Sequence, residues 1–178
     1  MRADILSLIW GLWCAGWLIG GAWSARTVKR ESWRSRVPVI VLFALGFIPL
    51  FRSRPVWQEP VVFDAGVAIT IAGLAFTVWA RLHLGRQWSG TVTLKADHQL
   101  IRSGPYALVR HPIYTGLLIA VAGTAIAHAT IAAFCGFALI AIGCLIKIRV
   151  EERLMTEQFG DAYRDYQRDV RMLIPFLW

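Results

Sequence analysis

Apolar blocks separated by short polar, mostly basic segments make up most of this 178-residue chain. Three blocks fill the first half, over residues 5–25, 37–51 and 61–80. A helix rises ~1.5 Å per residue and the hydrocarbon core of a bilayer is about 30 Å thick, so the first and third blocks are long enough to cross it. The second block is short and contains Pro49, so we expect it to recruit flanking residues or to lie at an angle.

The fourth block, residues 113–146, contains 34 residues and no Asp, Glu, Lys or Arg. One helix of that length would measure about 51 Å, which is too long for a single membrane span. The block therefore predicts a hairpin of two helices joined by a tight turn beside His128. Four glycines in this hairpin should let its two helices approach each other closely: Gly116, Gly123, Gly136 and Gly143.

The last 30 residues return to a polar composition with regularly spaced apolar positions. Phe159, Tyr163, Tyr166 and Val170 fall on one face of a helix. This pattern is typical of a short amphipathic helix lying on the membrane surface, and the alternative is a wall that covers a site.

The pattern as a whole predicts an all-α fold: a polytopic membrane protein with five transmembrane helices, a C-terminal helical hairpin and an amphipathic cytoplasmic tail helix. We expect a single membrane domain over residues 1–178. Within it, residues 1–80 supply three generic spans, and residues 81–178 supply a catalytic loop, the hairpin and a cofactor-binding tail.

Composition and charge support this interpretation. The chain is 57% hydrophobic with a mean hydropathy of +0.53, above the average of soluble domains. The net charge of +8 is spread between the apolar blocks, which indicates membrane topology and no nucleic-acid partner. Of the 19 Lys and Arg residues, 16 lie in segments 26–36, 81–112 and 147–178, which fall on one side of the membrane if there are five spans.

The positive-inside rule then places the N-terminus outside and the C-terminus and active site in the cytoplasm, at the inner membrane if the protein is bacterial. The three cysteines lie inside apolar blocks without metal-ligand spacing, so we expect neither a disulfide nor a metal site. Four tryptophans run through the N-terminal region without a clean cleavage site, which predicts a retained first helix.

The stretch "SGPYALVRHPIYTG", residues 103–116, carries the first candidate chemistry. Pro112 suits the first turn of a helix, where its missing N–H costs nothing. A helix start exposes N–H groups and a partial positive charge, so Arg110 and His111 beside it predict an anion site. By itself this motif fits a lipid-headgroup anchor equally well.

The stretch "KIRVEERL", residues 147–154, follows the hairpin and carries adjacent carboxylates at Glu151 and Glu152. A solvated, self-paired helix end is the alternative interpretation, because Lys147 lies four residues before Glu151. However, both ends of one hairpin now carry opposite charges on the same side of the membrane. We therefore predict that the two ends converge on one zwitterionic, amino-acid-like ligand.

Four segments together resemble the isoprenylcysteine carboxyl methyltransferase family and its phospholipid methyltransferase relatives. They are "LGRQWSG" (84–90), "HQLIRSGPYALVRHPIYTG" (98–116), "RVEERL" (149–154) and "FGDAYRDYQRDVRMLIPF" (159–176), in the order and at the spacing of that family. The resemblance implies a membrane-embedded enzyme that uses S-adenosylmethionine. It also implies a lipophilic acceptor from the bilayer, either a carboxylate of the isoprenylcysteine kind or a lipid headgroup.

By this resemblance, the cofactor-binding residues are His98, Gln99, Leu100, Ile101, Tyr106, His111, Pro112, Ile113, Tyr114, Glu151 and Glu152. The basic residue that orients the acceptor in the family falls on Lys147 or Arg149, which we take as the catalytic candidates. Eukaryotic members carry Arg where this chain has Asp169, which weakens the assignment of a prenylcysteine substrate.

Several alternatives remain open at this point. A carboxylate acceptor is ionised at neutral pH and needs no base, whereas an amine or thiol would need one, with His111 or Glu152 as candidates. Membrane sterol and steroid reductases, which bind NADPH, have similar tails, and a non-enzymatic membrane scaffold would also contain such helices. The sequence specifies neither the acceptor nor the oligomeric state.

Overall fold

Long helices dominate the computed structural model, which describes residues 2–21, 27–30, 33–53, 59–85, 93–95 and 100–175. Within these ranges the five long helices are α1 (Arg2–Gly21), α2 (Trp33–Arg52), α3 (Pro60–Leu84), α5 (Pro112–His128) and α6 (Ile131–Phe159). The shorter elements are β1 (Thr27–Arg30), β2 (Thr93–Lys95), α4 (Pro105–Leu108) and α7 (Asp161–Asp169). The long helices coincide with the predicted apolar blocks and confirm the helical fold.

The hairpin turn lies where the apolar pattern placed it. Helix α5 ends at His128, and Ala129 adopts the left-handed conformation with φ 51°. Thr130 then caps α6, because its hydroxyl accepts a hydrogen bond from the Ala133 N–H at 3.1 Å. The predicted hairpin is therefore confirmed.

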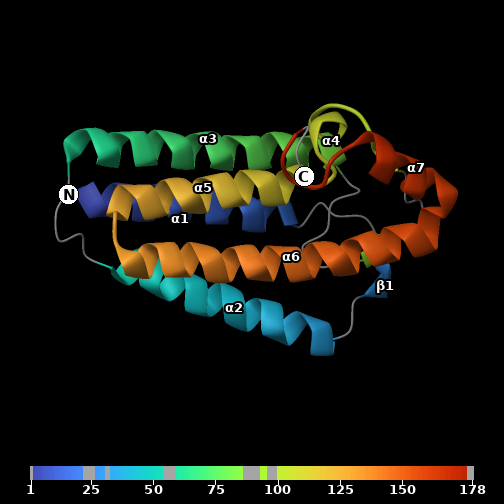
Figure 1. Ribbon diagram of the computed structural model, residues 1–178, viewed down its shortest axis with the longest axis horizontal. Coiled ribbons are helices and arrows are strands. Elements are labelled where there is room, and N and C mark those ends of the chain that lie inside the picture. The colour runs from blue at the N-terminus through green and yellow to red at the C-terminus, as the bar shows by residue number, and fades with distance from the viewer. Residues whose placement is uncertain are drawn as a thin grey trace.

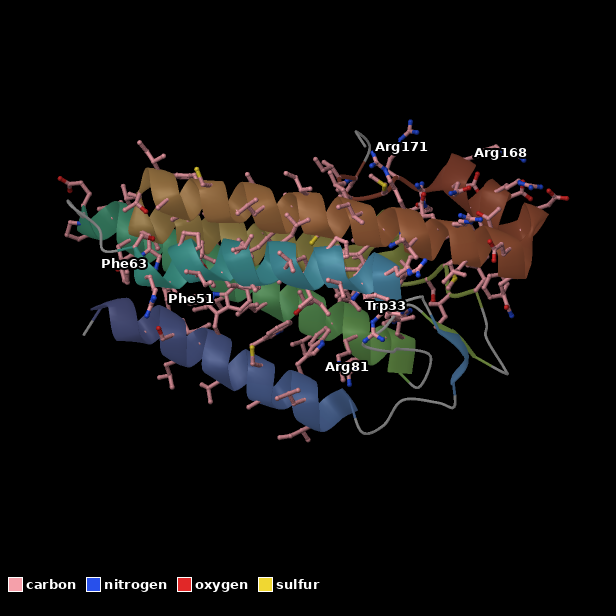
Figure 2. The ribbon with its side chains drawn as sticks, turned by 90° about the horizontal axis from the view of Figure 1, so that it is seen from below. Trp33, Phe51, Phe63, Arg81, Arg168 and Arg171 are labelled. Carbon is pink, nitrogen blue, oxygen red and sulfur yellow. The ribbon has the colours of Figure 1, made fainter. Side chains whose placement is uncertain are left out.

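Long helices that follow one another along the chain run antiparallel, so their connections gather at two ends (Figure 1). The chain's N-terminus and the α5–α6 turn lie at one end, whereas β1, α4 and α7 lie at the other. Figure 2 places Arg81, Arg168 and Arg171 toward this second end, and Phe51 and Phe63 at the first. The arrangement agrees with the predicted gathering of basic segments on one side.

Two described helices, α3 and α6, are long and apolar enough to cross a membrane, and residues 5–20 of α1 and all of α5 form shorter apolar helices. The count of five spans and their orientation stay predictions. The sequence pattern did not predict β1 and β2, which pair antiparallel and form a two-stranded ribbon. Both are short segments inside polar connections, where no apolar alternation marks a strand.

The hairpin glycines do not draw α5 and α6 together, so that expectation was wrong. Gly116 and Gly123 of α5 face Gly73 and Gly66 of α3, while Gly136 of α6 faces α2. A methyl group built on Gly73 would lie 2.6 Å from the Gly116 carbonyl oxygen, so these backbones are in contact. The partner glycines lie in the first half of the chain, and the hairpin sequence alone could not identify them.

Helix α1 is attached to the α3–α5 pair by hydrogen bonds from two indoles. Trp10 Nε1 donates to Thr124 Oγ1 at 3.0 Å, and Trp13 Nε1 donates to Thr77 Oγ1 at 2.8 Å. The hydroxyl of Thr70 lies 3.1 Å from that of Thr124 in the same buried cluster. These polar side chains thus meet each other's need for hydrogen bonds in an apolar setting.

The aromatic face of α7 packs on the protein, which contradicts the expectation that this helix lies on the membrane surface. Tyr163 and Tyr166 are each 2% exposed, and the Tyr166 hydroxyl donates to the Tyr106 carbonyl at 2.6 Å. The alternative of a wall over a site is the one that the packing favours. The spacing of the aromatic residues was right, but it could not show whether lipid or protein faces them.

Replacing Gly73 with Ala should destabilise the protein, because the added methyl collides with the backbone of α5. We expect a loss of about 1–3 kcal/mol, measured by thermal denaturation in detergent. Gly16→Ala in α1 is the matched control, since a methyl there meets nothing within 4 Å. Equal melting temperatures for the two variants would contradict the close α3–α5 contact.

Candidate functional site

The two polar ends of the α5–α6 hairpin meet at His111. Its imidazole lies between adjacent carboxylates of α6: Nδ1 is 3.3 Å from Glu151 Oε2, and Nε2 is 3.2 Å from Glu152 Oε1. His111 immediately precedes α5, which begins at Pro112, and its side chain is 7% exposed. The cationic end and the acidic end of the hairpin are thus within reach of one small molecule.

The geometry favours the doubly protonated form of His111. A neutral imidazole has one N–H, so one ring nitrogen would turn its lone pair toward a carboxylate. Burial lowers the pKa of His111, but hydrogen bonds to Glu151 and Glu152 and their negative charges raise it more, so the pKa lies above its ordinary value. The contacts and the direction of the pKa shift thus both favour an imidazolium between the two carboxylates.

Glu152 accepts hydrogen bonds from several side chains of the protein. It lies beyond the apolar part of α6, which ends at Ile146. Its Oε1 accepts from Arg110 Nε at 2.8 Å and from Nη2 at 2.7 Å, and its Oε2 accepts from Gln167 Nε2 at 3.2 Å. Burial raises the pKa of Glu152, but the hydrogen bonds and charges of His111 and Arg110 lower it below its usual range.

Glu151 is less fully engaged than its neighbour. Besides the contact with His111, its Oε1 accepts a hydrogen bond from the Tyr114 hydroxyl at 2.8 Å. A carboxylate has about four acceptor positions, so Glu151 retains capacity for a further donor. Its side chain is also more exposed than that of Glu152, at 26% against 19%.

The two acceptor-orienting candidates lie in different places. Lys147 has its Nζ 5.9 Å from the centre of the Tyr114 ring, on the helix face that also carries Glu151. Arg149 is exposed and lies about 160° around α6 from Lys147. The structure therefore brings Lys147, but not Arg149, to the acidic cluster.

The structure describes most of the other predicted cofactor residues. Tyr106 is buried in α4, and burial, followed by the negative charge of Glu151, raises its pKa, so its hydroxyl stays a neutral donor. Ile113 and Tyr114 occupy the first turn of α5, partly buried. Leu100 and Ile101 are also partly buried, whereas His98 and Gln99 lie outside the described residues.

Sequence reasoning missed the role of the chain that follows α7. The Arg110 N–H donates to the Arg171 carbonyl at 2.8 Å, and the His111 N–H donates to the Met172 carbonyl at 3.1 Å. The Thr115 hydroxyl donates to the Leu173 carbonyl at 2.8 Å. We call residues 170–173 the C-terminal strap; backbone carbonyls form these contacts, so no side-chain pattern announces them.

Asp169 stands at the edge of this strap. It is exposed and pairs with Arg102 at 2.6 Å, and the Arg102 guanidinium lies over the Tyr166 ring at 5.2 Å. The carboxylate is thus engaged in a surface ion pair at the end of α7.

Comparison with known proteins identifies related sequences and a related fold. Residues 66–157 match the isoprenylcysteine carboxyl methyltransferase (ICMT) family. Methanethiol S-methyltransferase 1 of Bradyrhizobium diazoefficiens is 30% identical over 174 residues, covering 86% of this chain and 58% of that protein. A probable protein-S-isoprenylcysteine O-methyltransferase of Oryza sativa subsp. indica is 32% identical over 112 residues, covering 62% and 53%.

Among solved structures, the eukaryotic intramembrane Ras methyltransferase ICMT is similar, with a TM-score of 0.58 and 25% identity. The match covers 84% of this chain and 55% of that one. This chain therefore spans between half and three fifths of the length of these relatives.

The raised pKa of His111 predicts a pH-dependent stability. The contribution of protonated His111 to the free energy of unfolding is fully present below the unfolded-state pKa of about 6.5. It is lost as pH rises through the higher pKa of the folded state. The melting temperature in detergent should therefore fall above about pH 6.5, and His111→Gln should flatten that fall. His83→Gln is the control, because His83 is an exposed residue bonded to Ser103. A pH profile unchanged by His111→Gln would contradict the imidazolium assignment.

Proposed function

This chain belongs to the isoprenylcysteine carboxyl methyltransferase family, and on that basis we propose that it is an integral-membrane methyltransferase. It uses S-adenosylmethionine and acts on a lipophilic acceptor from the bilayer. The observation that carries the proposal is the pairing of His111, at the start of α5, with Glu151 at the charged end of α6.

The residues of the cluster fit the amino-acid part of this cofactor. A carboxylate suits the positive N-terminal end of α5, where helix N–H groups lack partners within the helix. An ammonium suits Glu151, whose remaining acceptor positions would take its N–H groups. Tyr106 and Tyr114 contribute hydroxyl groups to the same region. His98, Gln99, Leu100 and Ile101, together with Pro112, Ile113 and Glu152, complete the proposed cofactor set.

The acceptor class follows from the contacts that already occupy the cluster. His111 directs both ring nitrogens at glutamates and Glu152 accepts hydrogen bonds from Arg110, so neither group is placed to act as a general base on an acceptor. An acceptor that arrives already ionised, such as a carboxylate, needs no base. The geometry therefore supports a carboxylate acceptor held by the ammonium of Lys147.

When bound, S-adenosylmethionine supplies a methyl group activated by its sulfonium sulfur. The chain's own contribution is to hold the two reactants close together and to exclude water. Lys147 would orient the acceptor without protonating it, because an ammonium beside a carboxylate keeps both groups charged.

A thiol acceptor is the second candidate, because a methanethiol S-methyltransferase is among the relatives that cover most of this chain. A thiol has an ordinary pKa of about 8.5, so the rate would rise with pH through the neutral range. The rate of transfer to a carboxylate would change little over that pH range, which distinguishes the two acceptors.

The family match favours methyl transfer over an NADPH-dependent reductase or a scaffold. Measuring which cofactor the purified protein binds separates all three functions.

Replacing Glu151 with Gln should weaken binding of S-adenosylmethionine by about 10- to 100-fold, because a hydrogen bond to a charged group contributes about 1.5–3 kcal/mol. Titration calorimetry on the detergent-purified protein measures this loss. Glu157→Gln is the matched control, since Glu157 lies further along α6 and pairs with the exposed Arg153. Unchanged affinity in a folded Glu151→Gln variant would remove Glu151 from the cofactor site.

Lys147→Met should lower kcat/KM for a carboxylate acceptor by about tenfold or more while leaving cofactor affinity near normal. The assay is transfer of labelled methyl groups from S-adenosylmethionine to a panel of prenylated cysteine analogues, thiols and lipids. Arg149→Met, on the exposed side of α6, should have little effect. The reverse ranking of the two variants would assign the acceptor to Arg149.

A further inference from the structure

Arg110 makes contacts that the proposed cofactor chemistry does not explain. Its guanidinium holds Glu152 on one side and donates from Nη1 to the carbonyls of Gln167, at 3.2 Å, and Val170 on the other. The side chain is 10% exposed, so these bonds form away from bulk water. Arg110 thus connects α6 to the end of α7 and to the chain that follows it.

We propose that Arg110 is a positioning residue that ties the C-terminal strap to Glu152, and that the docked strap sets the affinity of the site for S-adenosylmethionine. The inference rests on the proposed function, because the cofactor it concerns is the one assigned there. It assigns a role to residues 170–173, which lie outside the segment matched by the family.

The geometry of the Arg110 guanidinium suits this role. A planar fork of donors can hold a carboxylate and two carbonyls at once, whereas a lysine ammonium is a single point charge on a flexible stem. The same Glu152 oxygen that accepts from Arg110 also lies 3.2 Å from His111 Nε2. Movement of Arg110 would therefore change the charge balance around His111.

The C-terminal strap also bonds directly to the backbone of the site. The N–H groups of Arg110 and His111 donate to strap carbonyls, as does the Thr115 hydroxyl one turn into α5. An undocked strap would leave these donors without their partners next to a cluster that depends on fixed positions. The strap and the start of α5 consequently form one unit.

Two variants distinguish the effect of the contacts that hold the C-terminal strap from an effect on folding. Arg110→Lys keeps the charge but cannot reach all three acceptors, and Thr115→Val removes one strap hydrogen bond without touching either glutamate. Arg168→Gln is the control, because Arg168 is exposed and pairs with Asp165 on the surface of α7. Thr115→Val preserves side-chain shape and is expected to fold.

For each variant we would measure the Kd for S-adenosylmethionine by calorimetry, KM and kcat for methyl transfer, and tryptic cleavage after Arg171. Both test variants should raise the Kd and the cofactor KM by about fivefold or more and change kcat at saturation less than twofold. Cleavage after Arg171 should accelerate, because the carbonyl of that residue is held by the Arg110 N–H. Arg168→Gln should match the wild type in all three measurements.

Wild-type Kd and cleavage rates in both test variants would overturn the inference and leave the proposed function intact. A lower melting temperature with unchanged Kd and KM would also overturn it, since that result means a purely structural role. If the wild-type protein itself binds no S-adenosylmethionine, the proposed function fails and this inference fails with it.

Discussion

The contact of one imidazolium with two neighbouring carboxylates organises the polar end of this molecule. His111 can reach Glu151 and Glu152 together because it immediately precedes α5 while both glutamates lie on the charged extension of α6. The negative charge of the glutamates favours the protonated ring, and the ring in turn stabilises two adjacent carboxylates that would otherwise repel each other. Each member therefore depends on the charge state of the others.

The contact of His111 with the two glutamates requires α5 and α6 to be held at the right height relative to each other. Glycine packing against α3 and α2 holds them there. Close backbone contacts join α5 to α3 and α6 to α2, so each hairpin helix is held by a partner from the first half of the chain. Tight contacts of this kind resist sliding, because a shift of one helix brings side chains against backbone. The apparently generic first half is thus part of what positions the site.

The sequence predicted those features that a local pattern encodes. The uncharged block located the turn at His128, and Pro112 marked the start of α5; antiparallel helices joined by a tight turn then required Glu151 and His111 to lie at the same end. Features that depend on a distant partner were not predictable. Gly116 could pack on any neighbour, the tyrosines of α7 could face lipid or protein, and the strap bonds through carbonyls that every residue has.

The length of α6 bears on how two chemically unlike reactants could meet. Its apolar part ends at Ile146, but the helix continues unbroken to Phe159. In a bilayer whose hydrocarbon ends at Ile146, Glu151 stands about 8 Å farther out, which is the depth of the phospholipid headgroup layer. At that depth the proposed water-soluble donor would enter from the aqueous phase, and the proposed lipophilic acceptor would keep its tail among the acyl chains. In such a bilayer the unbroken length of α6 beyond Ile146 would set the carboxylates at the boundary between the lipid and the water.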